Sequence, residues 1–498
     1  MLIALDLGTT SCRAILFDLH GQVLAQASRT YPLATPHPGF AEQDPAELIA
    51  AAEAVVPEAI ARAGVEPGQV LGLSLSTHMH SLLLVGPGGE FLTPVITWAD
   101  GRSAPQAEAM RARPDWLDLY QRNGCPPHAM YPLYKLQWLQ AHQPGLVQRA
   151  VKVTGIKEVL LHRWSGEWAT DYSVGTASGL VNLHRLAWDE WALELAGVRP
   201  DQLPPLCEPT RSLPLTSGRV GLRSGTPIIV GAGDGLLSSL GSGAIEPGVL
   251  AAMVGTSGAL RAPVSRPTPD PQGRLWCYYL AKERWILGGA LNNGGIALRW
   301  FRDTFYPGEP EYDRPLADAA TAPVGSHSLL LLPYFAGERS PGFNSLARAV
   351  WFGLGLEHTR ADMARSVLEA VAYRLYSVLG PIEEVVGPAR EIRATGGFAR
   401  SDFWLQICAD LFGRPLTVPA QTEGSALGAL ALGLVGLGLA DDLSAVHRLV
   451  QPGRRLEPDL ANHEHYAELY ALYQQVSQSL QPHFRTLAQL RSGKDVTP

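Results

Sequence analysis

One pattern occurs twice in this chain, and it constrains the fold more than any other feature. An apolar strand segment, Leu2–Asp6, leads into Gly8-Thr9-Thr10-Ser11 and then into a second strand that begins at Arg13. About half a chain later, the segment Val249–Val254 leads into Gly255-Thr256-Ser257-Gly258 and a further strand from Ala259. A repeat of this kind is typical of a duplicated structural unit. We therefore predict an α/β protein built from two duplicated lobes.

Length and composition agree with two lobes. The chain has 498 residues, more than a single hydrophobic core usually organises. Its 46% hydrophobic and 17% charged residues are typical of a well-packed globular protein. We expect the first lobe to span residues 1–245 and the second to span residues 246–498.

Charge, cysteine usage and hydropathy exclude several classes of function. The net charge is −7 and no basic cluster is present, which argues against nucleic acid as a partner. Asp6 interrupts the first apolar run, and the apolar stretch Ala426–Ala440 is shorter than the roughly 20 residues that a membrane span needs. The cysteines are scattered without metal-type spacing, as expected of reduced thiols in a cytoplasmic protein, and they are Cys12, Cys125, Cys207, Cys277 and Cys408.

Several helices are predicted from caps and periodicity. Asp44-Pro45 predicts a helix start, and Pro57 would break or kink the helix that runs on towards Arg62. Proline at 482 likewise ends or kinks a helix predicted over residues 463–480. The remaining predicted segments are helices over residues 362–379 and 401–411, a buried helix over 426–440 and a frayed tail over 491–498.

The two Gly-Thr-Thr/Ser loops are candidate phosphate-binding loops. Tight turns of this type expose converging backbone N–H groups and hydroxyls, and glycine allows phosphate oxygens to approach the backbone. A single such loop could equally be an ordinary hairpin turn, but two copies in two lobes favour a shared nucleotide cleft. No GxxxxGK[ST] motif occurs, which disfavours the P-loop architecture. Gly396-Gly397, followed by Ser401, forms a third strand-to-helix turn that could hold a base and a ribose.

Two aspartates are the candidate reactive carboxylates. Asp234 follows the strand-like run Pro227–Val230 within Gly231-Ala232-Gly233-Asp234-Gly235. Its small neighbours let a substrate hydroxyl approach, which suits a general base. The alternative role is a turn residue that caps the next helix. Asp6 precedes the first phosphate-type loop, where a carboxylate implies Mg²⁺ held through water.

Further polar and aromatic residues could bind a polyol. Hydroxyl groups need Asp, Asn and His partners, while a Trp ring can cover the C–H face. The candidate residues are Met79, His80, Trp98, Asp100, Arg102, His128, Asn292 and Asn293. A lone histidine is more often a satisfied core residue, and we keep that interpretation for His78 and His162.

With these motifs in order, the chain resembles the FGGY family of carbohydrate kinases, within the actin-like sugar kinase superfamily. The resemblance runs from Leu2 to about Leu439. It rests on Asp6-Leu7-Gly8-Thr9-Thr10, Gly231–Gly235, Gly255–Gly258, Gly295 with Arg299-Trp300, and Ala394-Thr395-Gly396-Gly397. It implies ribonuclease-H-like lobes around a cleft, with the sugar and the catalytic base in the first lobe and the nucleotide in the second.

The resemblance also assigns roles to single residues. Asp234 would be the catalytic base, and Asp6 and Asp234 would face Mg²⁺. The residues that would contact ATP are Gly8, Thr9, Thr10, Ser11, Gly255, Thr256, Gly295, Gly397 and Ser401.

Within the family, several stretches resemble gluconokinases, among them Met79–Leu82, Ile96–Asp100, Asp171–Ser173 and Asn292–Ile296. This implies ATP-dependent phosphorylation of the 6-hydroxyl of D-gluconate by a cytoplasmic enzyme with a small-molecule substrate. A homodimer is compatible with the resemblance. Cys125–Pro132 and Thr77-His78 depart from the subfamily pattern, which leaves the substrate less constrained than the chemistry.

Other functions stay open at this point. A xylulokinase or another polyol kinase is the alternative within the family, although Ser81 stands where a xylulokinase would carry glycine. A non-catalytic ATP-binding sugar sensor is the alternative outside it. The candidate partners of a substrate carboxylate are His80, Arg102, His128, Lys157, Asn292 and Asn293.

Overall fold

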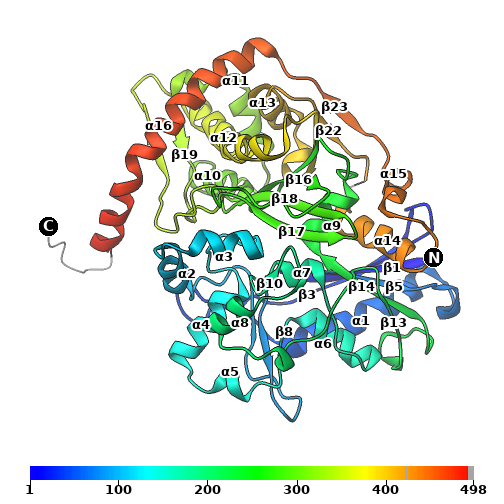
Figure 1. The fold of residues 1–498 in the computed structure, drawn as a ribbon. Coiled ribbons are helices and arrows are strands. Elements are labelled where there is room, and N and C mark those ends of the chain that lie inside the picture. The colour runs from blue at the N-terminus through cyan, green and yellow to red at the C-terminus, as the bar shows by residue number, and fades with distance from the viewer. Residues whose placement is uncertain (422, 492–498) are drawn as a thin grey trace. The chain divides into compact units, whose positions relative to one another are not determined.

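The computed structural model describes residues 1–421 and 423–491 (Figure 1). By their contacts these residues form two compact units. Of the described residues, the first unit comprises 1–245, 263–287 and 423–451, and the second comprises 246–262, 288–421 and 452–491. One change of unit falls at 245/246. Two later segments, 263–287 and 423–451, cluster with the first unit, so each unit is assembled from discontinuous stretches.

The first unit is built on a six-stranded sheet of order β13-β14-β5-β1-β2-β3. Its central strand β1 pairs antiparallel with β2 and parallel with β5, so the predicted first strands do form neighbours. The strands are β1 (Leu2–Leu7), β2 (Ser11–Phe17), β3 (Val23–Thr30), β5 (Leu73–Thr77), β13 (Ser212–Pro214) and β14 (Pro227–Gly233). Short pairs join β4 (Glu42–Gln43) to β7 (Val95–Ile96), β6 (Leu83–Val85) to β8 (Lys152–Thr154), β9 (Thr170–Asp171) to β12 (Leu206–Cys207), and β10 (Val181–Asn182) to β11 (Ala187–Trp188).

Both faces of this sheet are covered, because every residue of β1 is buried and all of them except Asp6 are apolar. Ile3, Leu5 and Leu7 belong to one hydrophobic cluster, whereas Leu2 and Ala4 belong to another. Alternate side chains of a strand point to opposite faces. A strand buried on both faces therefore reads as a continuous apolar run.

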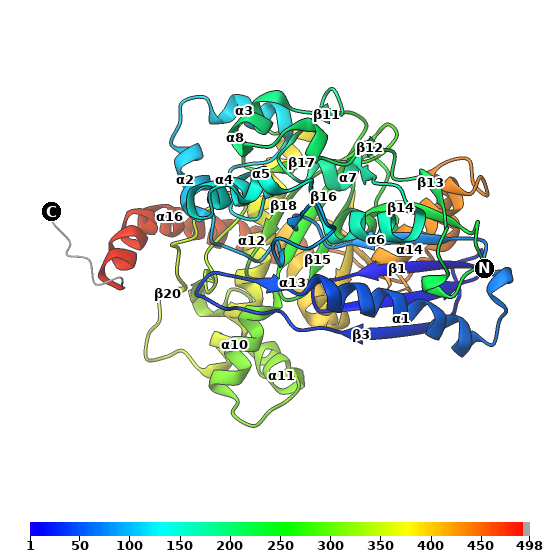
Figure 2. The same cartoon turned by 90° about the horizontal axis from the view of Figure 1, so that it is seen from below.

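Helix α1 (Pro45–Ala63) covers the first of these faces and lies along β2 and β3 (Figure 2). The Asp44 side chain accepts a hydrogen bond from Ala46 N, as predicted for an N-cap. The helix continues through Pro57 instead of breaking there. The other helices of this unit are α2 (Ala104–Arg111), α3 (Trp116–Asn123), α4 (Pro132–His142), α5 (Leu146–Arg149), α6 (Ile156–Ser165), α7 (Tyr172–Thr176), α8 (Glu190–Ala196), α9 (Asp234–Gly241), α14 (Gly424–Gly436) and α15 (Val446–Leu449).

Helices α9 and α14 pack backbone against backbone. A Cβ on Gly428 would lie 2.1 Å from the carbonyl oxygen of Leu237, and one on Gly241 would lie 1.8 Å from that of Gly424. Only glycine allows so close an approach. The buried helix predicted over 426–440 thus packs against the helix that begins with Asp234, but it ends at Gly436, and Leu439 beyond it is exposed.

Replacing Gly428 with alanine should destabilise the first unit by about 1–3 kcal/mol, the usual cost of overpacking. In an open helix the same change would stabilise by roughly 0.5–1 kcal/mol. Urea denaturation of the variant measures the difference. Gly218→Ala is the matched control, because no atom lies within 4 Å of a Cβ at Gly218. Equal stability of the two variants would contradict the close helix contact.

The second large sheet repeats the same strand pattern, and β15 and β21 at its centre belong to the second unit. Its order is β17-β18-β16-β15-β21-β22-β23, with β15 antiparallel to β16 and parallel to β21. Strand β17 lies within 263–287, the segment that clusters with the first unit. The duplicated α/β lobes are thus present. The strands are β15 (Val249–Val254), β16 (Gly258–Val264), β17 (Trp276–Ala281), β18 (Arg284–Leu291), β21 (Glu391–Gly396), β22 (Leu416–Val418) and β23 (Arg454–Leu456), with β19 (Leu330–Leu332) and β20 (Val350–Phe352) paired separately.

The helices of the second unit are α10 (Gly295–Phe305), α11 (Asp313–Thr321), α12 (Arg360–Val386), α13 (Asp402–Phe412) and α16 (Leu460–Arg491). Helix α16 runs through Pro482, and α12 extends beyond its predicted end through Pro381. The predicted tail over 491–498 lies outside the described residues except for Arg491.

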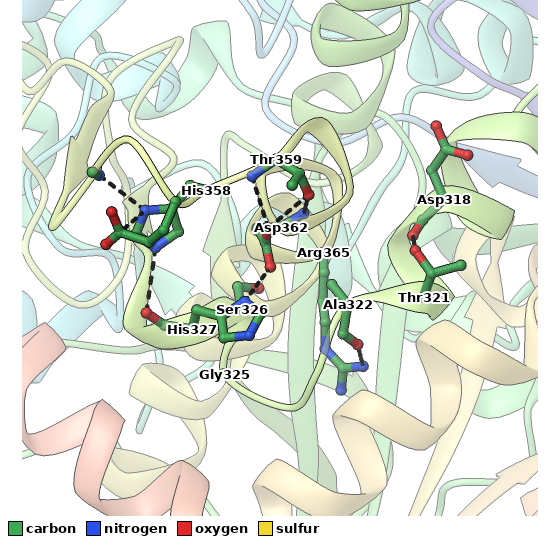
Figure 3. Close-up of polar contacts among 12 residues, drawn as sticks. Asp318, Thr321, Ala322, Gly325, Ser326, His327, His358, Thr359, Asp362 and Arg365 are labelled. Carbon is green, nitrogen blue, oxygen red and sulfur yellow. Dashed lines mark hydrogen bonds and ion pairs between the residues drawn. The ribbon is translucent and has the colours of Figure 1, made fainter.

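Helix α12 is fixed at its N-terminus to the turn that follows α11 (Figure 3). The Thr359 side chain caps α12, and Asp362 accepts hydrogen bonds from Thr359 and contacts His327 Nδ1 at 2.7 Å. Burial alone would raise the pKa of Asp362, but these hydrogen bonds outweigh it and lower that pKa. Arg365 donates to the carbonyl of Ala322 just after α11. These contacts hold α11, one of the helices around the cavity described below.

All five cysteines are buried free thiols. Burial is the main cause that raises the pKa of each, to about 11 for Cys207 and about 12 for Cys277. No helix among residues 1–421 and 423–491 is long and apolar enough to cross a membrane.

Candidate active site

The second unit contains a cavity of about 560 Å³. It gathers the predicted nucleotide residues of this unit, Gly255, Thr256, Gly295, Gly397 and Ser401. The other lining residues are Val254, Ile296, Leu298, Arg299, Glu311, Tyr312, Asp313, Leu316, Phe398, Arg400 and Trp404. A cleft of this size with apolar walls and a few polar groups is typical of a small-molecule site.

The cavity lies where two parallel strands end. Val254 of β15 is the register partner of Gly396 of β21, and the loops after both residues line the cavity. Ligands of open α/β sheets bind at such carboxyl ends of strands. Gly396 has φ +92°, and a Cβ on it would lie 2.6 Å from the Val254 carbonyl oxygen. Glycine is therefore required at this strand end.

The second phosphate-type loop rests on the start of α10. Gly295 N donates to the Gly255 carbonyl at 2.7 Å, and Ile296 N donates to the Thr256 carbonyl at 3.1 Å. A Cβ on Gly294 would lie 2.5 Å from the Ser257 carbonyl oxygen. The first N–H groups of α10 are therefore occupied by carbonyls of the loop, and these bonds fix the loop against the helix.

Several lining residues were not predicted as ligands. Arg299 and Arg400 are exposed cations beside the two loops, and the ring of Trp404 lines the same cavity. Arg299 was visible in the family motif but was given no role. Glu311, Tyr312 and Asp313 come from a segment without any motif, so sequence inspection had no signal for them.

Replacing Thr256 with valine should raise the KM for ATP by roughly 10- to 150-fold, since one hydrogen bond to a charged group is worth about 1.5–3 kcal/mol. The substitution preserves shape and the backbone bonds from Gly294 and Ile296. The KM for the sugar should change little. Steady-state kinetics with each substrate varied tests this, with Thr226→Val in the first unit as the matched control. An unchanged KM for ATP would show that the hydroxyl makes no contact with the nucleotide.

In the first unit, Asp6 lies at the end of β1 and is 6% exposed. Its carboxylate accepts hydrogen bonds from Ser76 (2.7 Å) and Ser425 (3.1 Å), and it pairs with Arg13 at 3.0 Å. Arg13 also pairs with Glu423 at 2.8 Å. Arg13 was not predicted as a site residue, although the hairpin register places it directly opposite Asp6.

The first phosphate-type loop is fixed by one hydrogen bond within the turn and by side chains from other segments. Gly8 N donates to the Ser11 carbonyl at 3.0 Å, which closes the turn. The Gly8 carbonyl accepts from the Tyr31 hydroxyl at 2.6 Å, and the Thr9 carbonyl accepts from Gln43 at 2.7 Å. Trp98 Nε1 donates to the Thr9 hydroxyl at 2.8 Å, so a predicted sugar residue and a predicted phosphate residue are in direct contact.

Asp234 is the first residue of α9, immediately after β14. The register of β14 against β5 shifts between Ile229 and Ala232, and Gly231 lies there at φ +76°. Bulges of this kind often redirect a side chain at a functional site. Asp6 and Ala232 both pair with Ser76, from opposite sides. Strands β1 and β14 are therefore two strand spacings apart, about 10 Å. Asp234 follows β14 at the same end of the sheet at which Asp6 lies.

The backbone before Asp234 is fixed by two neighbours. Gly233 N donates to the Ser173 hydroxyl at 2.9 Å. A Cβ on Gly233 would lie 2.4 Å from the Met79 side chain. The absence of a side chain at Gly233 therefore makes room for Met79, another predicted sugar residue.

His80 follows β5 and adopts φ +66°, the left-handed region that non-glycine residues rarely occupy. Its Nδ1 lies 2.7 Å from the Ala177 carbonyl oxygen, and its ring makes edge contacts with Tyr131 and Tyr278. His78 is buried beneath it with Nδ1 3.0 Å from the Leu7 carbonyl oxygen. Burial lowers the pKa of His78, in keeping with a core histidine.

Asp100 and Arg102 form a closed structural pair. Asp100 accepts hydrogen bonds from Arg102 and from the backbone N–H groups of Ala41 and Arg102. Arg102 also pairs with Glu42 and lies 3.7 Å from the centre of the Phe40 ring. Both carboxylate oxygens of Asp100 are thus engaged within the protein, an arrangement that fixes the loop after Trp98.

Three other predicted sugar residues lie elsewhere. His128 is in the loop before α4, where its Nδ1 accepts from Met130 N at 3.2 Å. Asn292 and Asn293 belong to the second unit. Their side chains donate to the carbonyls of Ala336 (2.8 Å) and Gly337 (2.7 Å).

Lys157 is buried and forms an ion pair with Asp171, so it is not a solvated helix residue. Asp171 also caps α7 by accepting from Val174 N. Because α7 carries Ser173, which contacts Gly233, the ion pair supports the backbone before Asp234. Burial raises the pKa of the neighbouring Glu158.

Metal ligands are sparse here. No cluster of three or more His, Cys, Asp or Glu side chains in residues 1–421 and 423–491 is arranged to hold a metal ion. Mg²⁺ usually keeps several waters and binds through one or two carboxylates together with substrate phosphates. The carboxylates of Asp6 and Asp234 at one sheet edge fit a site of that kind.

The chain is similar to known carbohydrate kinases over nearly its whole length. The N-terminal domain of the FGGY family of carbohydrate kinases matches residues 1–241, and the C-terminal domain matches residues 250–437. Gluconokinase of Bacillus subtilis (strain 168) is 37% identical over 507 residues, which cover 99% of this chain and 98% of that protein.

Two solved structures are similar over nearly the whole chain. Gluconate kinase from Lactobacillus acidophilus has a TM-score of 0.93 at 34% identity, covering 98% of this chain and 99% of that chain. Ligand-bound xylulose kinase from the same organism has a TM-score of 0.94 at 34% identity with the same coverage. The fold and the site define a carbohydrate kinase, a phosphotransferase with an alcohol group as acceptor. The chain belongs to the FGGY family of carbohydrate kinases.

Proposed function

We propose that this kinase transfers the γ-phosphate of ATP to the 6-hydroxyl of D-gluconate, giving 6-phospho-D-gluconate. The observation that carries the chemistry is Asp234 at the exit of β14, with its backbone fixed through Gly233. The nearly full-length identity to a gluconokinase supports the choice of gluconate.

In this proposal Asp234 accepts the proton of the attacking hydroxyl. General bases act within hydrogen-bond reach of that proton. Met79, His80 and Trp98 would surround the sugar, because all three lie on loops that contact either Gly233 or the Thr9 loop. Asp100 and Arg102 would support that surface from beneath, since each already pairs with the other.

The nucleotide would occupy the cavity of the second unit. The Gly255-Thr256 loop, with the Thr256 hydroxyl, would face the phosphates, with Arg299 and Arg400 nearby. Phosphoryl transfer depends mainly on positioning and electrostatic stabilisation. Asp6 and Asp234 would hold Mg²⁺ through water, and the ion would neutralise charge on the phosphates. Arg13 would add a positive charge beside Asp6.

Because the base and the nucleotide residues belong to different units, we infer that transfer requires the units to bring their ligands together. Closure of this kind excludes water that would otherwise be phosphorylated. A cytoplasmic location, where the five thiols stay reduced, is part of the proposal.

Xylulose is the second candidate substrate, because the xylulose kinase structure matches this fold as well as the gluconate kinase structure does. Gluconate carries an anionic carboxylate where xylulose carries a hydroxymethyl ketone. Two candidate carboxylate partners, Arg102 and Lys157, are already engaged in ion pairs. The architecture alone therefore does not decide between the substrates.

The purified enzyme should be assayed with ATP and Mg²⁺ against D-gluconate, D-xylulose and glycerol, with product detected by ³¹P NMR. We expect the highest kcat/KM with D-gluconate and a phosphate monoester at C6. A preference for D-xylulose or glycerol would overturn the gluconate assignment and leave the kinase assignment intact. Nucleotide binding without turnover of any polyol would instead favour a sugar sensor.

A further inference from the structure

Lys135, in the first turn of α4, is a fully buried cation. Its ammonium group donates to three backbone carbonyls, those of His80 (2.6 Å), Thr97 (2.7 Å) and Ile96 (3.3 Å). Burying a charge costs several kcal/mol unless strong contacts offset it. Here burial is the largest cause and lowers the pKa of Lys135 to about 7, Asp100 acting in the opposite direction and Arg102 adding to the decrease.

Two of the carbonyls that Lys135 contacts, those of His80 and Thr97, belong to the loops that carry the proposed sugar residues, and the third belongs to Ile96 at the end of β7. One loop follows β5 and contains Met79 and His80, and the other follows β7 and contains Trp98. Strand β5 belongs to the six-stranded sheet and β7 pairs with β4, and the chain after His80 reaches β7 through the Leu82–Ile96 bridge. Lys135 adds a second connection, at the His80 and Thr97 carbonyls where the loops themselves begin.

The His80 loop needs such support. A non-glycine residue in the left-handed region costs of order 1–3 kcal/mol and persists only where its surroundings fix it. At His80 the side chain is held by the Ala177 carbonyl, and the backbone carbonyl is held by Lys135. The second loop is in turn tied to the phosphate-type loop through Trp98 and Thr9.

We propose that Lys135 is a positioning residue for the acceptor sugar, whose ammonium group joins the His80 and Trp98 loops into a single binding surface. This inference rests on the proposed function only in that it takes these two loops to face the sugar. Lys135 does not touch the substrate itself, and it lies in the first unit, whereas the nucleotide cavity belongs to the second. Its removal should therefore affect the acceptor and spare the nucleotide.

Lys135→Met removes the charge and keeps the length of the chain. We expect the KM for the preferred acceptor to rise at least about 10-fold, as for loss of a hydrogen bond to a charged group, with less than a two-fold change in the KM for ATP. Lys152→Met is the matched control, because Lys152 donates to the Asp201 carbonyl on the surface of the same unit. It should leave both KM values within two-fold.

A double-mutant cycle with His80→Ala provides the decisive readout. Substitutions of residues that act through one another have non-additive effects. In the His80→Ala background, Lys135→Met should therefore raise the acceptor KM less than about three-fold. Equal effects of Lys135→Met in both backgrounds would overturn the proposal, as would a fall in kcat with an unchanged acceptor KM.

If Lys135→Met does not fold, Lys135→Arg serves instead. Arginine keeps the charge and the N–H donors but spreads them over a planar fork. It should raise the acceptor KM alone, and a parallel rise in the KM for ATP would contradict the proposal. All variants are assayed with the acceptor that the wild-type enzyme prefers. A wild-type preference for another sugar thus defeats the gluconate assignment without deciding the role of Lys135.

Discussion

Replacing Asp234 with asparagine is expected to lower kcat by about 100- to 10,000-fold, the usual cost of removing a general base. Asparagine has the same shape, but its amide cannot accept the hydroxyl proton. The Asp234 carboxylate accepts a hydrogen bond from Gly235 N at 2.6 Å, which the amide oxygen of asparagine can also accept. The fold of α9 and both substrate affinities should therefore persist.

Calorimetric titration and steady-state kinetics on the same preparation separate these effects. Asp201→Asn makes the same chemical change at a side chain that is 71% exposed and should leave kcat within two-fold. A turnover of Asp234→Asn near that of the wild type would remove Asp234 from the role of base. If Asp234→Asn lost both gluconate binding and turnover, Asp234 would instead be a residue that binds the sugar.

Lys157→Met is expected to destabilise the protein by about 3–5 kcal/mol, because removing one partner of a buried ion pair leaves the other charge uncompensated. Lys157 and Asp171 are 1% and 0% exposed as side chains. The loss is a large fraction of the 5–15 kcal/mol that typically stabilises a folded protein. Equilibrium unfolding in urea measures it.

The double variant Lys157→Met/Asp171→Asn is the control for this effect. It removes both charges while leaving an amide oxygen to accept the hydrogen bond from Val174 N. It should recover more than half of the lost stability. A loss below about 1 kcal/mol in the single variant would be that of an ordinary substitution, and it would show that Asp171 finds another partner.

Much of the architecture could be predicted because its signals are local. The strand–loop–strand repeat is written in consecutive residues, so both halves could be recognised and paired. The helices through Pro57 and Pro482 could not be predicted in the same way, because proline weakens a helix locally. The buried face of α1, with Leu48, Val55 and Val56, stabilises it from outside the helix.

The site divides along the same line. Residues in strand-end loops, such as Asp6, Gly255 and Gly397, could be selected from sequence, and the structure puts each at a sheet edge. Asp100 accepts from Ala41 N, and its partner Arg102 pairs with Glu42. Ala41 and Glu42 are far from Asp100 in the sequence, so no local signal revealed that its oxygens are occupied. The Asp6–Arg13 pair could have been predicted, because it follows from the register of a predicted hairpin.

The first unit also includes segments from the second half of the chain, and no local sequence pattern indicates this. Segments 263–287 and 423–451 leave the second half of the chain and cluster with the first unit. Glu423 and Ser425 thereby join Asp6 and Arg13 although more than four hundred residues separate them. Only long-range packing determines that connection.

The burial of every thiol has a practical consequence for following this enzyme at work. Thiol-reactive dyes need an accessible thiolate, and all five native cysteines are buried with raised pKa values. Cysteines introduced at Asp201 and Glu357, whose side chains are 71% and 72% exposed, would then be the sites that label in the native enzyme. One position lies in each unit. Fluorescence energy transfer between the two dyes could record their separation during turnover in an enzyme that keeps all its natural cysteines.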